Sequence, residues 1–137
     1  MPRLPSVETM MANDEASRAL GIELIDQDEG RAVTRMTVRG DMVNGHAMAH
    51  GGLIFTLADT AFACACNSFG PMTVAASAEI VFVAPARAGD VLVAEAVLRT
   101  RFGRSGVYDV TVRRGGEVIA EFRGHSHQLG HQLGPVS

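Results

Sequence analysis

The segment that most constrains the fold is residues 50–69, which predicts a helix that is apolar on nearly every face. Its large side chains, among them Leu53, Ile54 and Phe55, point in different directions around the axis. Such a helix has to be buried by the rest of the chain. Its most apolar run, residues 51–66, is too short to cross a bilayer comfortably and carries an Asp, so we expect a core helix and no membrane association.

Strand patterns flank this helix on both sides. Two precede it, at residues 21–26 and 31–39, and four follow it, at 74–83, 90–101, 107–113 and 118–127. Short connections such as Arg114-Gly115-Gly116 are typical of antiparallel hairpins. We therefore predict an α+β fold in which a curved antiparallel sheet of five to six strands wraps around one long central helix.

The length of 137 residues predicts a single domain, 1–137. Within an N-terminal helical segment, 1–20, Pro5 and Ser6 predict the start of one helix and Gly21 its end. We expect residues 128–137 to form a flexible tail.

Charge and cysteine usage limit the partners and the compartment. The net charge is -3, so nucleic acid is not an expected partner. All twelve basic residues are Arg. Cys64 and Cys66 point about 200° apart on a helix and cannot pair, which favours a reducing compartment. The N-terminal residues include acids and no apolar signal core, so we expect a cytoplasmic protein.

Asp59 is the main candidate for chemistry, because it is the one charged residue of the apolar helix. Burying an unpaired carboxylate costs several kcal/mol or shifts its pKa, so the fold must gain something by keeping it. The structural alternative is a narrow polar edge of the helix that Asp59 shares with Thr56, Thr60 and Ser68.

The residues before the helix, Asn44-Gly45-His46 and His50-Gly51-Gly52, are a second candidate site. The first turn of a helix carries free N–H groups and the positive end of the dipole. Glycine there lets a ligand carbonyl approach the backbone, as an oxyanion hole requires. A plain loop with a glycine at the helix start is the alternative.

Spacing adds a constraint on these two candidates. Asp59 lies eight residues beyond Gly51, about 12 Å along one helix. A base and an oxyanion donor must both lie within about 3 Å of the reacting atoms. Two antiparallel copies of the helix can satisfy this, so catalysis by both groups predicts a dimer with shared sites.

Other site types have little support. His125 and His127 share a strand face and His131 follows them, but a polar tail explains them better than a metal site, and we expect no metal. There is no G-x-S-x-G elbow and no glycine loop with phosphate-binding spacing.

The motifs Asn44-Gly45-His46, His50-Gly51-Gly52 and Leu57-Ala58-Asp59-Thr60 resemble, in order and spacing, the hotdog-fold acyl-CoA thioesterases. The branch they most resemble is the PaaI type, tied to phenylacetate degradation. The resemblance covers roughly residues 8–130. It implies hydrolysis of a small, aromatic acyl-CoA without a cofactor, by dimers that join edge to edge and pair again into homotetramers.

The resemblance also implies roles for single residues. Asp59 would be the general base or nucleophile, and the Gly51 N–H would polarise the thioester carbonyl. Asn44 would place the carbonyl or the water, and His50 would brace the loop. Related enzymes hold the water with a Ser or Thr where this chain has Ala75, and we expect Ser77 to lie on the same face as Ala75. The remaining expected contacts to substrate or coenzyme A are Gly52, Thr60, Ser77, Arg87, Arg101, Arg104 and Arg123.

Two other functions stay open at this point. A hotdog acyl dehydratase needs a His paired with an acid, which His50 and Asp59 nominally allow. A non-hydrolytic acyl-CoA-binding protein is the other alternative, although a pure binder would gain by replacing Asp59 with an apolar residue.

Overall fold

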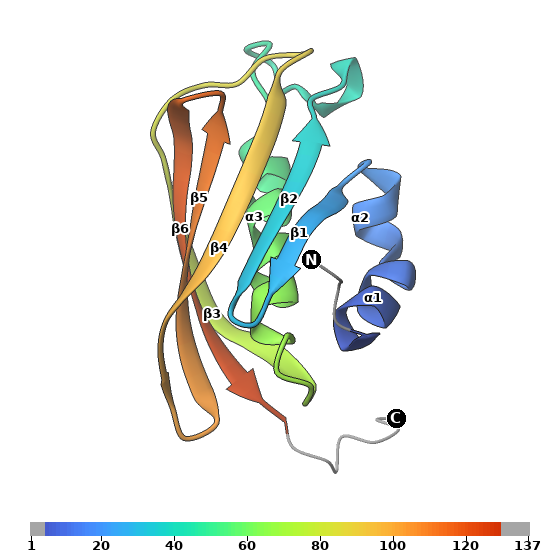
Figure 1. The fold of residues 1–137 in the computed structure, drawn as a ribbon. Coiled ribbons are helices and arrows are strands. Elements are labelled where there is room, and N and C mark those ends of the chain that lie inside the picture. The colour runs from blue at the N-terminus through green and yellow to red at the C-terminus, as the bar shows by residue number, and fades with distance from the viewer. Residues whose placement is uncertain (1–4, 130–137) are drawn as a thin grey trace.

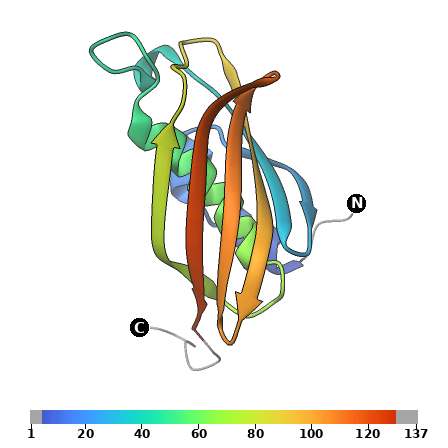
Figure 2. The ribbon, with the colours of Figure 1, turned by 90° about the vertical axis from the view of Figure 1, so that its left-hand side faces the viewer.

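The computed structural model describes residues 5–129, which form one six-stranded sheet and three α-helices (Figure 1). The strands lie in the order β1-β2-β4-β5-β6-β3, and all neighbours are antiparallel. In Figure 2 the sheet is seen from its outer side, with α3 behind it and β3 at one edge. This confirms the predicted α+β hotdog architecture. The elements are α1 (Pro5–Ala12), α2 (Glu15–Ala19), β1 (Glu23–Asp28), β2 (Arg31–Thr37), the 3-10 turn η1 (Gly40–Met42), α3 (Gly51–Cys66), β3 (Thr73–Phe82), β4 (Val91–Phe102), β5 (Ser105–Arg114) and β6 (Glu117–Gln128).

The central helix α3 supplies the core, as its sequence predicts. Leu57, Ala58 and Ala61 are fully buried, and Phe62 is 1% exposed. The Phe62 ring meets Tyr108 of β5 edge-on, with centroids 5.5 Å apart. It also lies against Gly124 of β6, where an added Cβ would come within 2.7 Å of the ring. The sheet can therefore close on the helix because β6 has no side chain at that point.

The N-terminal segment differs from the single helix that we predicted. The helix breaks at Asn13 and Asp14, and Asp14 caps α2 by accepting from the backbone N–H of Ser17 at 2.9 Å. The Ser17 hydroxyl then lies 2.8 Å from the Thr60 hydroxyl of α3. Aspartate is a strong N-cap, so it starts a second helix where we expected one helix to continue.

The hairpins follow their turn residues. Gly115, with φ of +59°, allows the two-residue connection between β5 and β6. Gly103, with φ of +58°, turns the chain between β4 and β5. Of the expected tail, residues 128–137, the structure describes only Gln128, which ends β6, and Leu129. The rest of the tail, including His131, lies outside the described residues.

A β-bulge corrects one prediction about faces. The register of β3 against β6 shifts between Ala75 and Ser77, so Ala75 is opposite Ser126 and Ser77 is opposite His125. Ser126 is buried toward α3, whereas His125 belongs to the outer face. The extra residue at the bulge therefore turns Ala75 and Ser77 to opposite faces of the sheet.

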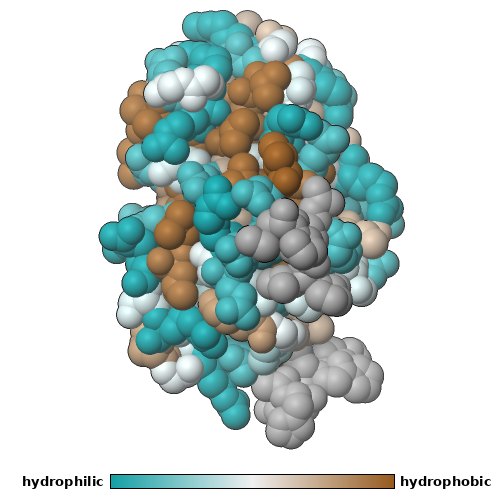
Figure 3. All heavy atoms as spheres, in the orientation of Figure 1, coloured by the Kyte–Doolittle hydropathy of each residue, from teal (hydrophilic) through white to brown (hydrophobic). Residues whose placement is uncertain are grey.

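Surface chemistry is mixed on the face seen in Figure 1. Figure 3 shows hydrophobic residues there only as patches among hydrophilic ones. Within residues 5–129, no helix is long and apolar enough to cross a membrane.

Candidate active site

The loop before α3 is held in shape by Asn44. Its side-chain oxygen accepts from the backbone N–H groups of His46, at 2.8 Å, and Met48, at 3.2 Å. Its backbone N–H donates to the Met48 carbonyl at 2.7 Å. The side-chain NH₂ of Asn44 has no partner among the described residues, and Asn44 borders the hollow beside Gly51. Asn44 thus braces the loop and keeps two N–H donors for a ligand.

The first turn of α3 offers one unused backbone donor, at Gly51. The His50 ring caps the helix, because its Nδ1 accepts from the Gly52 N–H at 3.2 Å. The N–H groups of Leu53 and Ile54 donate to the His50 carbonyl. Within the described part of the chain the Gly51 N–H has no acceptor, and the helix dipole adds positive potential there. This donor suits a carbonyl oxygen that gains negative charge.

A hollow of about 390 Å³ opens beside Gly51. Its walls come from the loop, from α3 and from the end of β3, and most of them are apolar. They are Asn44, Met48, Ala49, Gly51, Ile54, Phe82, Val83, Ala84, Pro85 and Ala86. The sequence analysis did not single out Phe82, and the available signal was its position near the end of a predicted strand, three residues before Pro85.

Asp59 lies on the half-buried face of α3, and its carboxylate has no hydrogen-bond partner among residues 5–129. Burial raises the pKa of Asp59, and the nearby charge of Asp14 raises it further. Both effects follow from a charge held in a poorly hydrated place beside a like charge. The carboxylate is thus a stronger base than an exposed aspartate, as proton abstraction requires.

Gly51 and Asp59 do not meet within one chain. They lie eight residues apart on one helix, about 12 Å along its axis. Asp59 does not border the hollow beside Gly51. Each chain therefore carries two separate candidate half-sites on the same helix, one at Gly51 and one at Asp59.

Thr60 and Ser77 lie outside these half-sites. The buried Thr60 hydroxyl donates to the Thr56 carbonyl at 2.9 Å and meets Ser17, which docks α2 on α3. Ser77 lies on the outer face beside Arg123 and His125. Substrate contacts by Thr60 and Ser77 stay predictions.

The four candidate arginines differ in whether the guanidinium already has a partner within the chain. Arg123 donates to both carboxylate oxygens of Asp109, at 2.7 and 2.9 Å. Arg101 lies over the Phe69 ring, 3.9 Å from its centroid. Arg87 reaches the Ala47 carbonyl at 3.5 Å, beside the loop that precedes α3.

Arg104 stands in the turn between β4 and β5, near the C-terminal end of α3. Its side chain is exposed and has no partner among the described residues. It is therefore the arginine of the four whose guanidinium is most available to an anion.

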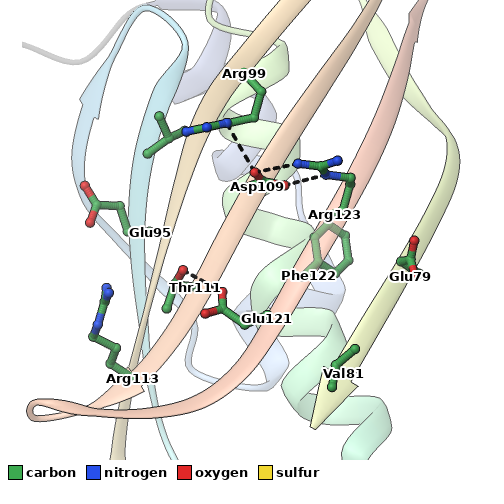
Figure 4. Close-up of a pocket in the computed structure, with 11 residues that line it drawn as sticks. Glu79, Val81, Glu95, Arg99, Asp109, Thr111, Arg113, Glu121, Phe122 and Arg123 are labelled. Carbon is green, nitrogen blue, oxygen red and sulfur yellow. Dashed lines mark hydrogen bonds and ion pairs between the residues drawn. The ribbon is translucent and has the colours of Figure 1, made fainter. Parts of the chain in front are cut away.

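A larger hollow, about 600 Å³, lies on the outer face of the sheet, away from α3. Figure 4 shows Asp109 there between Arg99 and Arg123, with Thr111 bonded to Glu121. These charges are paired with one another, and neither Gly51 nor Asp59 borders this hollow. The larger hollow therefore does not contain the candidate residues Gly51 and Asp59.

The cysteines and histidines offer no competing centre in the described residues. Burial raises the pKa of the Cys66 thiol to about 12, so it is protonated at neutral pH and a poor nucleophile. No group of three or more His, Cys, Asp or Glu side chains within residues 5–129 could hold a metal ion.

Comparison with known proteins places this geometry in a family. Residues 46–121 match the model of the Thioesterase superfamily. The chain is 48% identical to acyl-coenzyme A thioesterase PaaI of Escherichia coli K12, over 91% of this chain and 90% of that protein. The structure of the E. coli PaaI protein from the phenylacetic acid degradation operon superposes with a TM-score of 0.89 at 47% identity, covering 91% of each chain.

A second solved structure gives the same result. It is a mutant form of the phenylacetic acid degradation protein PaaI from Thermus thermophilus, with a TM-score of 0.82 at 37% identity. It covers 85% of this chain and all of that one.

Proposed function

This chain belongs to the thioesterase superfamily and is an acyl-CoA thioesterase of the PaaI type, and from that premise we propose that it hydrolyses small aromatic acyl-CoA thioesters of the phenylacetyl or hydroxyphenylacetyl kind. The names of the E. coli and T. thermophilus relatives, which refer to phenylacetic acid degradation, support the aromatic acyl group. The apolar walls of the hollow beside Gly51 support it as well.

The observation that carries the mechanism is the half-buried, unpartnered carboxylate of Asp59 with its raised pKa. In the proposed reaction Asp59 takes a proton from water, and the water oxygen adds to the thioester carbonyl. The carbon–sulfur bond then breaks, and the proton passes to the departing coenzyme A sulfur. Asp59 acting as the nucleophile is the other form of the same proposal, with water releasing the acyl group in a second step.

Gly51 completes the proposed reaction from the other half-site. Its free N–H would hold the carbonyl oxygen as charge develops on it, and such a donor is worth roughly 3 kcal/mol in the transition state. The NH₂ group of Asn44, at the edge of the same hollow, would place the carbonyl or the water. His50 keeps the turn in shape through its bond to the Gly52 N–H.

Because the two half-sites are separated along one helix, we propose that each complete site joins Gly51 of one chain to Asp59 of a second. The free edge of β3 supports a partner there, since its Val74 and Val81 are exposed. An apolar strand edge left in water tends to pair with another strand. The outer face, which carries both acidic and basic side chains, is where we propose that two such dimers meet to form a homotetramer.

Coenzyme A brings several phosphate charges to a chain whose net charge is negative. We propose that Arg104, with Arg101 and Arg87, supplies the local positive charge. Arg87 lies near the start of α3 and Arg104 near its end. In an antiparallel pair of chains these two ends face each other, so arginines of both chains would approach one ligand.

The proposal is tested by release of free thiol from a panel of acyl-CoAs, with wild-type protein and Asp59→Asn. We expect turnover to fall at least about a hundredfold when the base is removed, with the melting temperature retained. Asp28→Asn, at the end of β1, is the matched control and should hydrolyse normally. Near-normal thiol release by folded Asp59→Asn would remove the mechanism. Binding of acyl-CoA without any thiol release by the wild type would instead favour a non-hydrolytic binder.

A further inference from the structure

Phe82, the last residue of β3, lies directly over the proposed oxyanion donor. An added Cβ on Gly51 would be 2.9 Å from Cζ of the Phe82 ring and 3.3 and 3.4 Å from its two Cε atoms. The ring therefore packs on the Gly51 backbone as closely as glycine allows. Yet Phe82 remains 51% exposed, so the second face of the ring has no cover within the described chain.

This contact explains why glycine stands at position 51. The residue has no positive φ that would require glycine. A side chain at position 51 would push the ring away. Glycine at position 51 thus leaves room for an aromatic ring beside the donor.

The ring also forms one wall of the hollow beside Gly51. The other large walls are aliphatic or flexible, from Met48, Ile54 and Pro85. Of the residues that border this hollow, Phe82 is the one aromatic side chain. A thioester whose oxygen reaches the Gly51 N–H must therefore enter beside a flat, half-exposed ring.

We propose that Phe82 is a specificity-determining residue, whose ring packs against the acyl group and favours a flat aromatic group over an aliphatic chain of equal carbon number. The inference rests on the proposed function and names the side chain that selects its substrate class. Offset or edge-to-face aromatic pairs gain more than their buried area alone gives.

The competing explanation is structural: the exposed ring of Phe82 serves only to cover the edge of β3 in a dimer. The two explanations predict different effects on the ratio of activity toward aromatic and aliphatic acyl groups. A dimer contact affects every substrate equally, whereas a wall of the acyl site changes one acyl group relative to another.

The experiment compares kcat/KM for phenylacetyl-CoA and octanoyl-CoA, which carry eight acyl carbons each, in wild type and Phe82→Leu. We expect the aromatic-to-aliphatic ratio to fall about three- to tenfold, the factor by which aromatic pairing exceeds simple burial. Phe82→Tyr keeps a ring and should keep the ratio. Phe102→Leu is the matched control, because Phe102 is 52% exposed at the far end of the sheet and should leave the ratio unchanged.

An unchanged ratio in Phe82→Leu, with both activities lowered together, overturns the inference and leaves the structural explanation. An equal fall of the ratio in Phe102→Leu overturns it as well. Gel filtration of each variant tells whether assembly has changed. If the wild-type protein releases thiol from no acyl-CoA, the proposed function itself has failed. The wild-type assay shows this before any variant is compared, so the two failures are distinguishable.

Discussion

Phe62 and Gly124 form a very close contact between α3 and the sheet, so Gly124→Ala should destabilise the protein. The added Cβ would lie 2.7–2.8 Å from three carbons of the Phe62 ring, about 0.6–0.7 Å inside the 3.4 Å at which ordinary contact begins. The ring has little room to move, because it is 1% exposed and packs on Tyr108 and Phe122 at 5.5 and 5.7 Å.

Overpacking of this kind costs about 1–3 kcal/mol, and for a chain of this size about 2 kcal/mol corresponds to a fall of roughly 5–10 °C in melting temperature. Thermal and urea unfolding measure it. Gly116→Ala is the matched control, because nothing lies within 4 Å of the added Cβ in that hairpin turn. The cost of Gly124→Ala should shrink in a Phe62→Leu background, since the smaller side chain leaves space.

Equal melting of Gly124→Ala and Gly116→Ala would refute the claimed closeness of helix and sheet. So would full additivity of Gly124→Ala with Phe62→Leu. The contact also bears on activity, because Phe62 lies one turn of α3 after Asp59. A displaced ring should move that turn, so we expect lower turnover well below the melting temperature.

Two further predictions concern charge. In Asp14→Asn the cap of α2 is kept but the charge that helps to raise the pKa of Asp59 is removed, so that pKa falls. A general base acts only when it is deprotonated, so activity is lost as the pH falls through its pKa. The acidic limb of the plot of kcat/KM against pH should therefore move to lower pH in Asp14→Asn. An acidic limb that does not move contradicts the prediction. Arg104→Ala should raise KM for acyl-CoA at low salt with little change in kcat, because a phosphate contact is equal in ground and transition states. The effect should fade in high salt and be absent in Arg113→Ala, while an unchanged KM at low salt removes Arg104 from the site.

The fold was predictable where one residue pattern decides the outcome. An apolar helix can be stable only inside, and the hairpin of Gly115-Gly116 can turn in only a few ways. Gly51 and Asp59 could be singled out as candidates for a similar reason, because a lone carboxylate and glycines at a helix start stand out from the pattern, and their catalytic roles stay predictions.

The remaining features depend on contacts between distant segments. Asp14 ends one helix and starts another where α2 docks on α3 through Ser17 and Thr60. The bulge beside Ser77 exists only in the register of β3 on β6. The ring of Phe82 over Gly51 joins residues 31 positions apart, and nothing in the sequence indicates that these two positions meet.

The central claim is that Gly51 of one chain and Asp59 of another act on the same thioester. It is tested most directly by mixing two inactive variants, Asp59→Ala and Gly51→Val, and assaying the purified mixed dimer for thiol release. The account predicts one intact site per mixed dimer, formed by the unaltered Gly51 of one chain and the unaltered Asp59 of its partner, and hence about half of the wild-type turnover. A mixed dimer that stays inactive, while both parents fold and associate, would show that the sites are not shared.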